Sequence, residues 1–251
     1  MHISKIHRKY CENRRVNADT VDKTGETSRF IADHEGWPAT PRALLCWVVV
    51  VAALCWGTQA SAGNQKEEAL ADSVRIALSN AITDARPPKA RFDEVNDRIN
   101  YSYWLGEMSK RLQRKLPDAH VRLEFLETVW YEARRAGLDP AMVLGLIEVE
   151  SAFRKYAMSH AGARGYMQVM PFWTRVIGDH DPKKLFHMQT NLRYGCSILR
   201  MYIDTERGNL YLALGRYNGS RGKPEYPNAV LATWKRWEYK SERMERNTGR
   251  Q

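Results

Sequence analysis

Glu150 is the residue whose type and position best suit acid–base chemistry. From Pro140 onward the apolar residues recur with helical spacing, so that Val143, Ile147 and position 150 lie on one stripe. A carboxylate on the buried face of a helix costs several kcal/mol unless it is paired or neutral. The spacing alone leaves two interpretations open: a buried ion pair with an arginine, or a catalytic carboxyl group.

The helix that carries Glu150 has clear boundaries. Gly137 suits the end of a preceding helix, Asp139 can cap free backbone N–H groups, and Pro140 fits the first helical position. Glu148 points about 200° around the helix from Glu150, because successive residues turn by roughly 100°. The two carboxylates therefore cannot act as a pair, and Glu148 is expected to meet solvent or an arginine.

The chain after Phe153 loses its helical period. It is rich in small residues from Ala157 to Gly165, and then reads Y-M-Q-V-M-P-F-W, in which Gln168 is the one polar residue. Glycine lets a backbone approach another group closely. A buried carboxyl group followed by such a loop favours the catalytic interpretation of Glu150.

Three short motifs follow one another between Leu123 and Trp234. They are Glu-Ser within an apolar helix, Gly-Tyr-Met-Gln and Arg-Tyr-Asn, at Glu150-Ser151, Gly165–Gln168 and Arg216–Asn218. In this order they resemble the motifs of the soluble lytic transglycosylase family, which has a lysozyme-like fold. The family has Leu in place of Tyr166 and Ala in place of Arg216, and these departures leave the substrate preference open.

The resemblance implies an enzyme that cleaves peptidoglycan without consuming water. Glu150 would protonate the oxygen of the β-1,4 bond between MurNAc and GlcNAc, while the N-acetyl oxygen of MurNAc closes onto C1. Glu150 would then take the proton of the C6 hydroxyl, which leaves a 1,6-anhydroMurNAc end. The apolar surroundings of Glu150 predict a raised pKa, so that the carboxyl group is protonated near neutral pH.

The resemblance also assigns substrate-binding roles. Ser151 is expected to hold the carboxylate or the substrate, Gln168 to hydrogen-bond a sugar, and the Tyr217 hydroxyl to steady the reacting group. The full set of implied substrate-binding residues is Ser151, Met167, Gln168, Tyr217 and Asn218.

Further residues are expected to support this site. Tyr166 could stack on a sugar face, as could Phe172-Trp173, for which a place in the core is the alternative. Thr190 or Asn191 is expected to cap the next helix, and Gly195 to permit a close helix crossing. His180 and His187 lack the spacing of known metal ligands, and no phosphate-binding glycine loop followed by Lys is found, so neither a metal nor a cofactor is expected.

Two other functions remain open. A lysozyme-type hydrolase on the same fold would need a second carboxylate or a well-held water, and the motif region offers no obvious candidate. A non-catalytic peptidoglycan-binding protein would be expected to lack Glu150 or to have replaced Tyr217, and both are present.

The amino-terminal residues predict export. Residues 43–56 are all apolar, which suits the core of a secretory signal better than a membrane-spanning helix. Ala60-Ser61-Ala62 has the small-x-small pattern of a cleavage site, so cleavage after Ala62 and a periplasmic or cell-envelope location are expected; an uncleaved anchor is the alternative. The long polar leader, residues 1–41, is interpreted as an artefact of the assigned translation start.

The net charge of the 251-residue chain is +10, from 39 basic and 29 acidic residues. Residues 63–251 retain 31 basic and 23 acidic residues, so the excess belongs to the exported part. Export makes nucleic acid an unsuitable partner and leaves an anionic wall polymer, with a cell-envelope machine as a further candidate and a monomer as the expected state. Cys196 alone follows the cleavage site and is expected to be a buried apolar residue.

The fold is expected to be mainly α, with little or no sheet. Helical spacing is seen at 67–82, 92–112, 121–136, 140–151, 191–205, 209–216 and 229–237, and a short β excursion is possible near 166–169. We therefore expect a leader at 1–62, a helical segment at 63–118, a lysozyme-like catalytic domain at 119–238 and a charged tail at 239–251.

Overall fold

A computed structural model describes residues 65–83, 90, 92 and 94–239. All of them belong to one compact unit, Ala60–Gln251. The predicted signal core, the cleavage site after Ala62 and nearly all of the charged tail lie outside the described residues.

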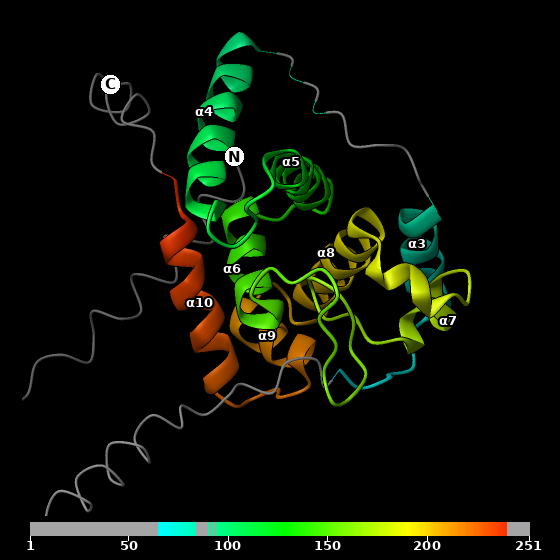
Figure 1. The fold of residues 1–251 in the computed structure, drawn as a ribbon. Coiled ribbons are helices and arrows are strands. Elements are labelled where there is room, and N and C mark those ends of the chain that lie inside the picture. The colour runs from blue at the N-terminus through cyan, green and yellow to red at the C-terminus, as the bar shows by residue number, and fades with distance from the viewer. Residues whose placement is uncertain (1–64, 84–89, 91, 93, 240–251) are drawn as a thin grey trace, which may run out of the picture. The chain divides into compact units, whose positions relative to one another are not determined.

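The described residues are mainly helical, as expected (Figure 1). In this part of the chain, β structure is limited to isolated bridges that join Arg164 to Met158 and to Val169. The helices are α3 (Asp72–Thr83), α4 (Val95–Leu112), α5 (Ala119–Arg135), α6 (Pro140–Ser151), α7 (Phe172–Ile177), η1 (Pro182–Phe186, a 3-10 helix), α8 (Met188–Thr205), α9 (Leu210–Asn218) and α10 (Glu225–Trp237).

Helix α6 lies in the core and is buried on almost every side, since α5 and α10 both pack against it (Figure 1). The Asp139 side chain caps it by accepting from the N–H of Ala141 at 2.7 Å, and Gly137 turns the chain just before it with φ 66°. The contact with α10 is close at Gly145, because a Cβ there would lie 2.6 Å from the backbone nitrogen of Trp234. Glycine at position 145 therefore fixes how near α6 and α10 come to each other.

Helix α8 packs against α3, α5 and α9. A buried ion pair joins α8 to α5, with Arg193 Nη2 2.9 Å from Glu132 Oε1. Arg135 binds the other oxygen of Glu132 and also donates to the carbonyl of Ala81 at 2.8 Å, which attaches α3 to this cluster.

Several helix boundaries differ from the predicted ones. Helix α3 begins at Asp72 instead of residue 67, since residues 65–71 are not helical. Side chains of Gln65, Glu67 and Glu68 instead contact other elements. Helix α8 begins at Met188 after an N-cap at His187, so the predicted cap at Thr190 or Asn191 is wrong. Helix α9 continues through Tyr217 and Asn218, and α10 starts four residues earlier than its apolar spacing indicated.

Candidate active site

Glu150 lies in the last turn of α6 with a side chain that is 5 % exposed. The Tyr226 hydroxyl, from the first turn of α10, donates a hydrogen bond to Glu150 Oε1 over 2.5 Å. The second oxygen, Oε2, is buried and has no hydrogen-bond partner among the described residues. One carboxyl oxygen is therefore positioned by a hydroxyl group, and the other is left for a further partner.

Burial raises the pKa of Glu150 to about 8, and the hydrogen bond from Tyr226 acts in the opposite direction. No ion pair joins Glu150 to any described arginine or lysine, so the ion-pair interpretation of this residue is wrong. Glu132 shows the contrast, because that buried carboxylate is bound by Arg193 and Arg135. Glu148 points away from Glu150, as predicted, and accepts from Trp237 Nε1 at 2.7 Å.

The backbone turns sharply just after Glu150. Ala152 and Phe153 have φ values of 50° and 64°, a left-handed backbone conformation that residues other than glycine rarely adopt. The Ser151 hydroxyl donates to the carbonyl of Tyr166 at 2.7 Å. Because that hydroxyl has one proton, Ser151 does not hold the Glu150 carboxylate, and it instead fastens residues 152–171, the site loop, to α6.

Asn191 organises the site loop from α8. Its side chain accepts from the N–H of Met167 at 2.8 Å and donates to the carbonyls of Arg164 and Leu185, each at 2.8 Å. Gly165 is needed beside it, since a Cβ there would lie 2.4 Å from Asn191 Nδ2. Asn191, which was predicted to cap a helix, thus binds the backbone of three residues near the Gly165–Gln168 motif.

Gln168 closes the end of this loop. Its φ is 49°, and its side-chain nitrogen donates to the carbonyls of Ala157 and Gly165 at 3.1 and 2.9 Å. The amide nitrogen is therefore occupied by backbone, and the predicted contact of Gln168 with a sugar would have to use its carbonyl oxygen.

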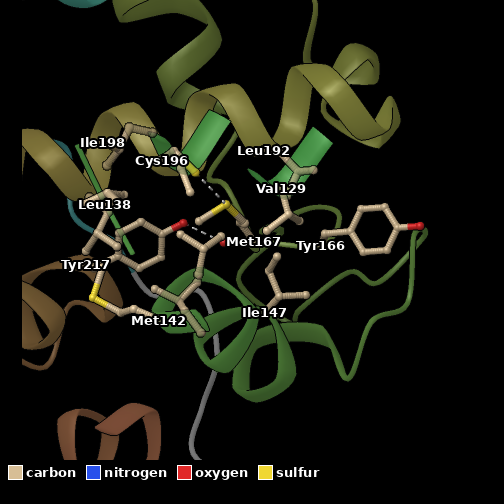
Figure 2. Packing of buried hydrophobic residues seen from close by; sticks show 14 of the residues in the cluster. Val129, Leu138, Met142, Ile147, Tyr166, Met167, Leu192, Cys196, Ile198 and Tyr217 are labelled. Carbon is tan, nitrogen blue, oxygen red and sulfur yellow. Dashed lines mark hydrogen bonds between the residues drawn. The ribbon is translucent and has the colours of Figure 1, made fainter. Parts of the chain in front are cut away.

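Tyr217 contacts the same loop from α9 (Figure 2). Its buried hydroxyl donates to the carbonyl of Met167 at 2.8 Å, so its proton is not directed at a reacting group. Burial raises the pKa of Tyr217 well above its usual value, and the charge of Glu150 raises it further. Tyr217 thus supports the loop, while Tyr226 is the hydroxyl that touches the acid.

The remaining residues that the sequence singled out lie near the hydrogen bond between Tyr217 and Met167. Met167 is fully buried, and Gly195 makes room for it, because a Cβ on Gly195 would lie 2.3 Å from Met167 Sδ. Gly195 therefore serves the site loop, and the predicted helix crossing is wrong. Cys196 is buried, as expected, with Sγ 4.0 Å from Met167 Sδ. Asn218 is buried at the end of α9.

The aromatic rings near the candidate site differ from the prediction in which of them are exposed. Tyr166 is buried, so the prediction that it stacks on a sugar face is wrong. Phe172 and Trp173 are buried in the core, which confirms the alternative given for them. The exposed ring of the site loop is that of Tyr156, which is 72 % exposed and lies with its centroid 6.0 Å from that of Phe186.

Sequence reasoning missed Tyr226, Tyr156 and the role of Asn191. Tyr226 precedes Pro227 at the start of a helix whose apolar spacing becomes clear only further on, and nothing local connects it with a residue 76 positions earlier. The one available signal was Pro224-Glu225, which resembles a helix start and would have placed Tyr226 in a first turn.

The Transglycosylase SLT domain family matches residues 127–231, which include every motif described above. These residues form a transglycosylase SLT domain. The match agrees with the resemblance of the three motifs to soluble lytic transglycosylases.

Curated relatives resemble about half of the chain. A membrane-bound lytic murein transglycosylase C from Actinobacillus pleuropneumoniae serotype 5b is 37 % identical over 135 residues, which cover 49 % of this chain and 35 % of that relative. A protein of the same name from Cronobacter sakazakii is 28 % identical over 144 residues, covering 50 % of this chain and 37 % of the relative. The chain thus spans little more than a third of the length of either relative.

A solved structure, that of an inactive mutant of the lytic transglycosylase Slt from Pseudomonas aeruginosa, is 22 % identical to this chain. The alignment covers 55 % of this chain and 26 % of that one, with a TM-score of 0.36.

Proposed function

We propose that this chain is a peptidoglycan lytic transglycosylase in which Glu150 acts first as an acid and then as a base. The observation that carries the proposal is the Glu150 carboxyl group inside an SLT domain, because it is buried, has a pKa near 8 and keeps one oxygen without a partner. Such a group is protonated at neutral pH and can give its proton to a leaving oxygen.

The first step breaks the β-1,4 bond between MurNAc and GlcNAc. Glu150 gives its proton to the oxygen that leaves with GlcNAc, and the N-acetyl oxygen of MurNAc forms a bond with C1. The site then holds a cyclic intermediate and the Glu150 carboxylate. The Tyr226 hydroxyl stabilises this anion, since a hydrogen bond to a charged acceptor is stronger than one to a neutral group.

The second step releases the intermediate without water. The Glu150 carboxylate takes the proton of the C6 hydroxyl of MurNAc, O6 bonds to C1, and the bond between C1 and the N-acetyl oxygen breaks. The 1,6-anhydro product forms and Glu150 recovers its proton, so one carboxyl group serves both steps.

The site loop is proposed to place the sugar beside Glu150. Ser151, Asn191 and Tyr217 bind the backbone of this loop at Tyr166 and Met167. Met167 and Gln168 of this loop, together with Asn218 at the end of α9, then act as substrate-binding residues, and the loop is fixed before substrate arrives.

The surroundings of other carboxylates argue against a hydrolase. Glu132, the other buried glutamate among the described residues, is engaged by Arg193, and Glu206, whose side chain is 6 % exposed, is engaged by Arg216. The hydrogen bond from Arg221, with that from Arg216, lowers the pKa of Glu206 to about 2, although burial opposes this. A two-carboxylate hydrolase needs a second unpaired acid beside the substrate.

We further propose that the protein acts in the cell envelope. The relatives named above are called membrane-bound murein transglycosylases, and the predicted signal and cleavage after Ala62 would deliver this chain to the same polymer. Within the described residues, no helix is both long enough and apolar enough to span a bilayer. Peptidoglycan strands are the proposed substrate, with a monomeric enzyme and a cell-envelope machine as its partner.

Digestion of purified peptidoglycan tests the function. The wild-type chain, Glu150→Gln and Glu148→Gln are compared, and the released muropeptides are weighed. The Glu148 variant is the matched control, because it removes a carboxylate two residues away that faces Trp237. We expect anhydro products, lighter by one water than hydrolysed ones, from the wild type and the control alone. Reducing-end products would instead make the chain a lysozyme, and binding without release would make it a wall-binding protein.

A further inference from the structure

The carboxyl-terminal ends of α4 and α10 lie beside each other (Figure 1). The Arg111 side chain joins them, since its Nη1 donates to the backbone carbonyls of Arg236 and Glu238 at 3.1 and 3.3 Å. Arg111 belongs to the last turn of α4, and the two carbonyls belong to the end of α10. Two helix ends whose residues are 125 positions apart in the chain therefore share one surface.

Both helix ends carry exposed basic residues, which together are called the basic patch. They are Lys110, Arg111, Arg114, Lys115, Lys235 and Arg236. Two of them have acidic partners, because Arg111 binds Glu107 at 2.8 Å and Arg236 lies 3.4 Å from Glu148 Oε2. The side chains of the other four make no ion pair with any described residue.

The helix dipole explains each basic end by itself but not the two together. A cation near the last turn of a helix interacts favourably with the partial negative charge of the final carbonyl groups. The same cations repel one another when two such ends meet, and Lys110 and Arg114 repel within one end because they are four positions apart. The fold gains little from the patch as a whole, so its excess positive charge is available to an anion outside the chain.

An exposed aromatic ring accompanies the cations on α4. Tyr103 is 57 % exposed and precedes Lys110 by seven positions, so the two side chains leave the helix in directions about 20° apart. The buried residues of α4 are Trp104, Met108 and Leu112. A tyrosine ring beside basic side chains is typical of segments at the surface of a lipid bilayer, where the ring lies among the headgroups and the cations reach the phosphates.

The patch suits an extended anionic surface better than a single anionic group. A site for one carboxylate or phosphate holds its cations in place through contacts with neighbouring side chains. Four of the six patch residues are exposed without such an ion pair among the described residues. A bilayer with anionic phospholipids presents many phosphates in one plane, so each cation can find a partner without a preformed geometry, and each strengthens binding about fivefold.

The patch is also separate from the candidate active site. All six of its residues lie outside residues 127–231, which the SLT family matches. Lys235 follows Tyr226 by nine positions on α10, so at 1.5 Å per residue it lies about 14 Å further along the helix than the residue that touches Glu150. A surface bound at the patch therefore leaves the Glu150 carboxyl group free.

We propose that the basic patch, together with Tyr103, binds the protein to a membrane surface that contains anionic phospholipids. The cations bind lipid phosphate groups, and the Tyr103 ring lies among the headgroups. This inference goes beyond the proposed function, because lipid binding does not depend on the reaction at Glu150.

Sedimentation with vesicles tests lipid binding. The full chain is mixed with vesicles of phosphatidylcholine alone, or of phosphatidylcholine and phosphatidylglycerol. Any binding through the apolar residues 43–56 is common to both kinds, so the difference between them measures the attraction to anionic lipid. We expect stronger binding to the anionic vesicles, and we expect this difference to shrink as salt is added, because salt screens exposed charges.

The variant Lys110→Gln/Arg114→Gln tests the patch itself. It removes two cations without breaking an ion pair among the described residues, and affinity for the anionic vesicles should fall by about tenfold or more. Lys66→Gln/Lys183→Gln is the matched control, because it removes the same charge from two exposed residues on other segments, and it should bind as the wild type does. Tyr103→Ala should weaken binding severalfold without changing the charge.

Three results would overturn the inference. The wild type would bind both kinds of vesicle equally, or the patch variant and its control would bind the anionic vesicles equally, or the patch variant would lose affinity for purified peptidoglycan while its vesicle binding is unchanged. The last result would make the wall polymer the partner of the patch. A wild type that releases no muropeptides but binds anionic vesicles through the patch would refute the proposed function and support this inference.

Discussion

The Tyr226 hydroxyl lies 2.5 Å from Oε1 of Glu150, although 76 positions separate the two residues in the chain. One residue belongs to the end of α6 and the other to the start of α10, two helices in close contact. Burial favours the neutral carboxyl group, and the hydrogen bond favours its anion. This pair therefore sets the pH range in which Glu150 holds a proton.

Replacement of Tyr226 by Phe should change that range. The hydrogen bond lowers the pKa of Glu150, so its loss raises the pKa above about 8 and moves the alkaline limb of kcat/KM to higher pH. The same change removes the donor that stabilises the carboxylate formed in the first step, so kcat should fall by about tenfold to a hundredfold. Tyr194→Phe is the control, because it removes the hydroxyl of a buried tyrosine on a different helix, α8. An alkaline limb that stays in place would show that Tyr226 does not govern the acid.

Replacement of Glu150 by Gln should alter the pH dependence of stability. The pKa of Glu150 is raised from 4.5 to about 8 in the folded state, so the unfolded chain releases this proton first as pH rises. The contribution of Glu150 to the free energy of unfolding is present below pH 4.5 and is lost as pH rises toward 8. The loss reaches on the order of 3 kcal/mol at neutral pH.

Urea denaturation at about pH 4 and about pH 8 measures this effect. The Gln variant should gain stability relative to the wild type between the two pH values, and Glu148→Gln should follow the wild type. Parallel curves for all three proteins would mean that the Glu150 carboxyl group is not perturbed.

Gly145→Ala should damage both stability and the site. The added Cβ would meet the Trp234 backbone at 2.6 and 2.8 Å, and backbone atoms cannot rotate away as a side chain does. We expect a loss of about 1–3 kcal/mol in the free energy of unfolding from overpacking. Displacement of α10 would also separate Tyr226 from Glu150, so kcat should fall in the fraction that remains folded. Gly106→Ala on α4 is the matched control and should be neutral or stabilising, since nothing lies within 4 Å of its Cβ.

Tyr156→Ala should weaken the binding of glycan strands. Its ring is exposed on the site loop beside Phe186, with the Lys155 ammonium 5.3 Å from its centroid. Aromatic rings exposed next to a binding loop can stack on the apolar face of a sugar, so we expect KM to rise severalfold while kcat changes little. Tyr103→Ala on α4 removes a ring with 57 % exposure and should leave KM unchanged. Equal KM values for the two variants would exclude Tyr156 from substrate binding.

The helices and the acid could be predicted because they depend on local spacing. Asp139, Pro140 and the apolar stripe place Glu150 at a buried position without any knowledge of its neighbours. Its partner could not be predicted, since the contact with Tyr226 depends on how α10 packs on α6. Asn191 was misread for a similar reason, because an Asn near a helix start resembles a cap, whereas this side chain reaches three backbone groups in other segments.

The motif residues Ser151 and Tyr217 were predicted to meet substrate, and each gives its proton to the site loop. Residue type alone could not distinguish these roles, because a hydroxyl group can donate a hydrogen bond to a sugar or to a backbone carbonyl equally well. The distinction comes from the left-handed backbone at Ala152 and Phe153, which brings the loop back over the end of α6.

The place of Glu150 in the last turn of α6 has an electrostatic consequence of its own. The carbonyl groups at the end of a helix carry a partial negative charge, which disfavours a second negative charge in the same turn. At the other end of α6, Asp139 accepts an N–H group where the helix is partially positive. The direction of this one helix therefore adds to burial in keeping a proton on Glu150. An acid at its opposite end would meet backbone donors that stabilise the anion, and would be less suited to donating its proton.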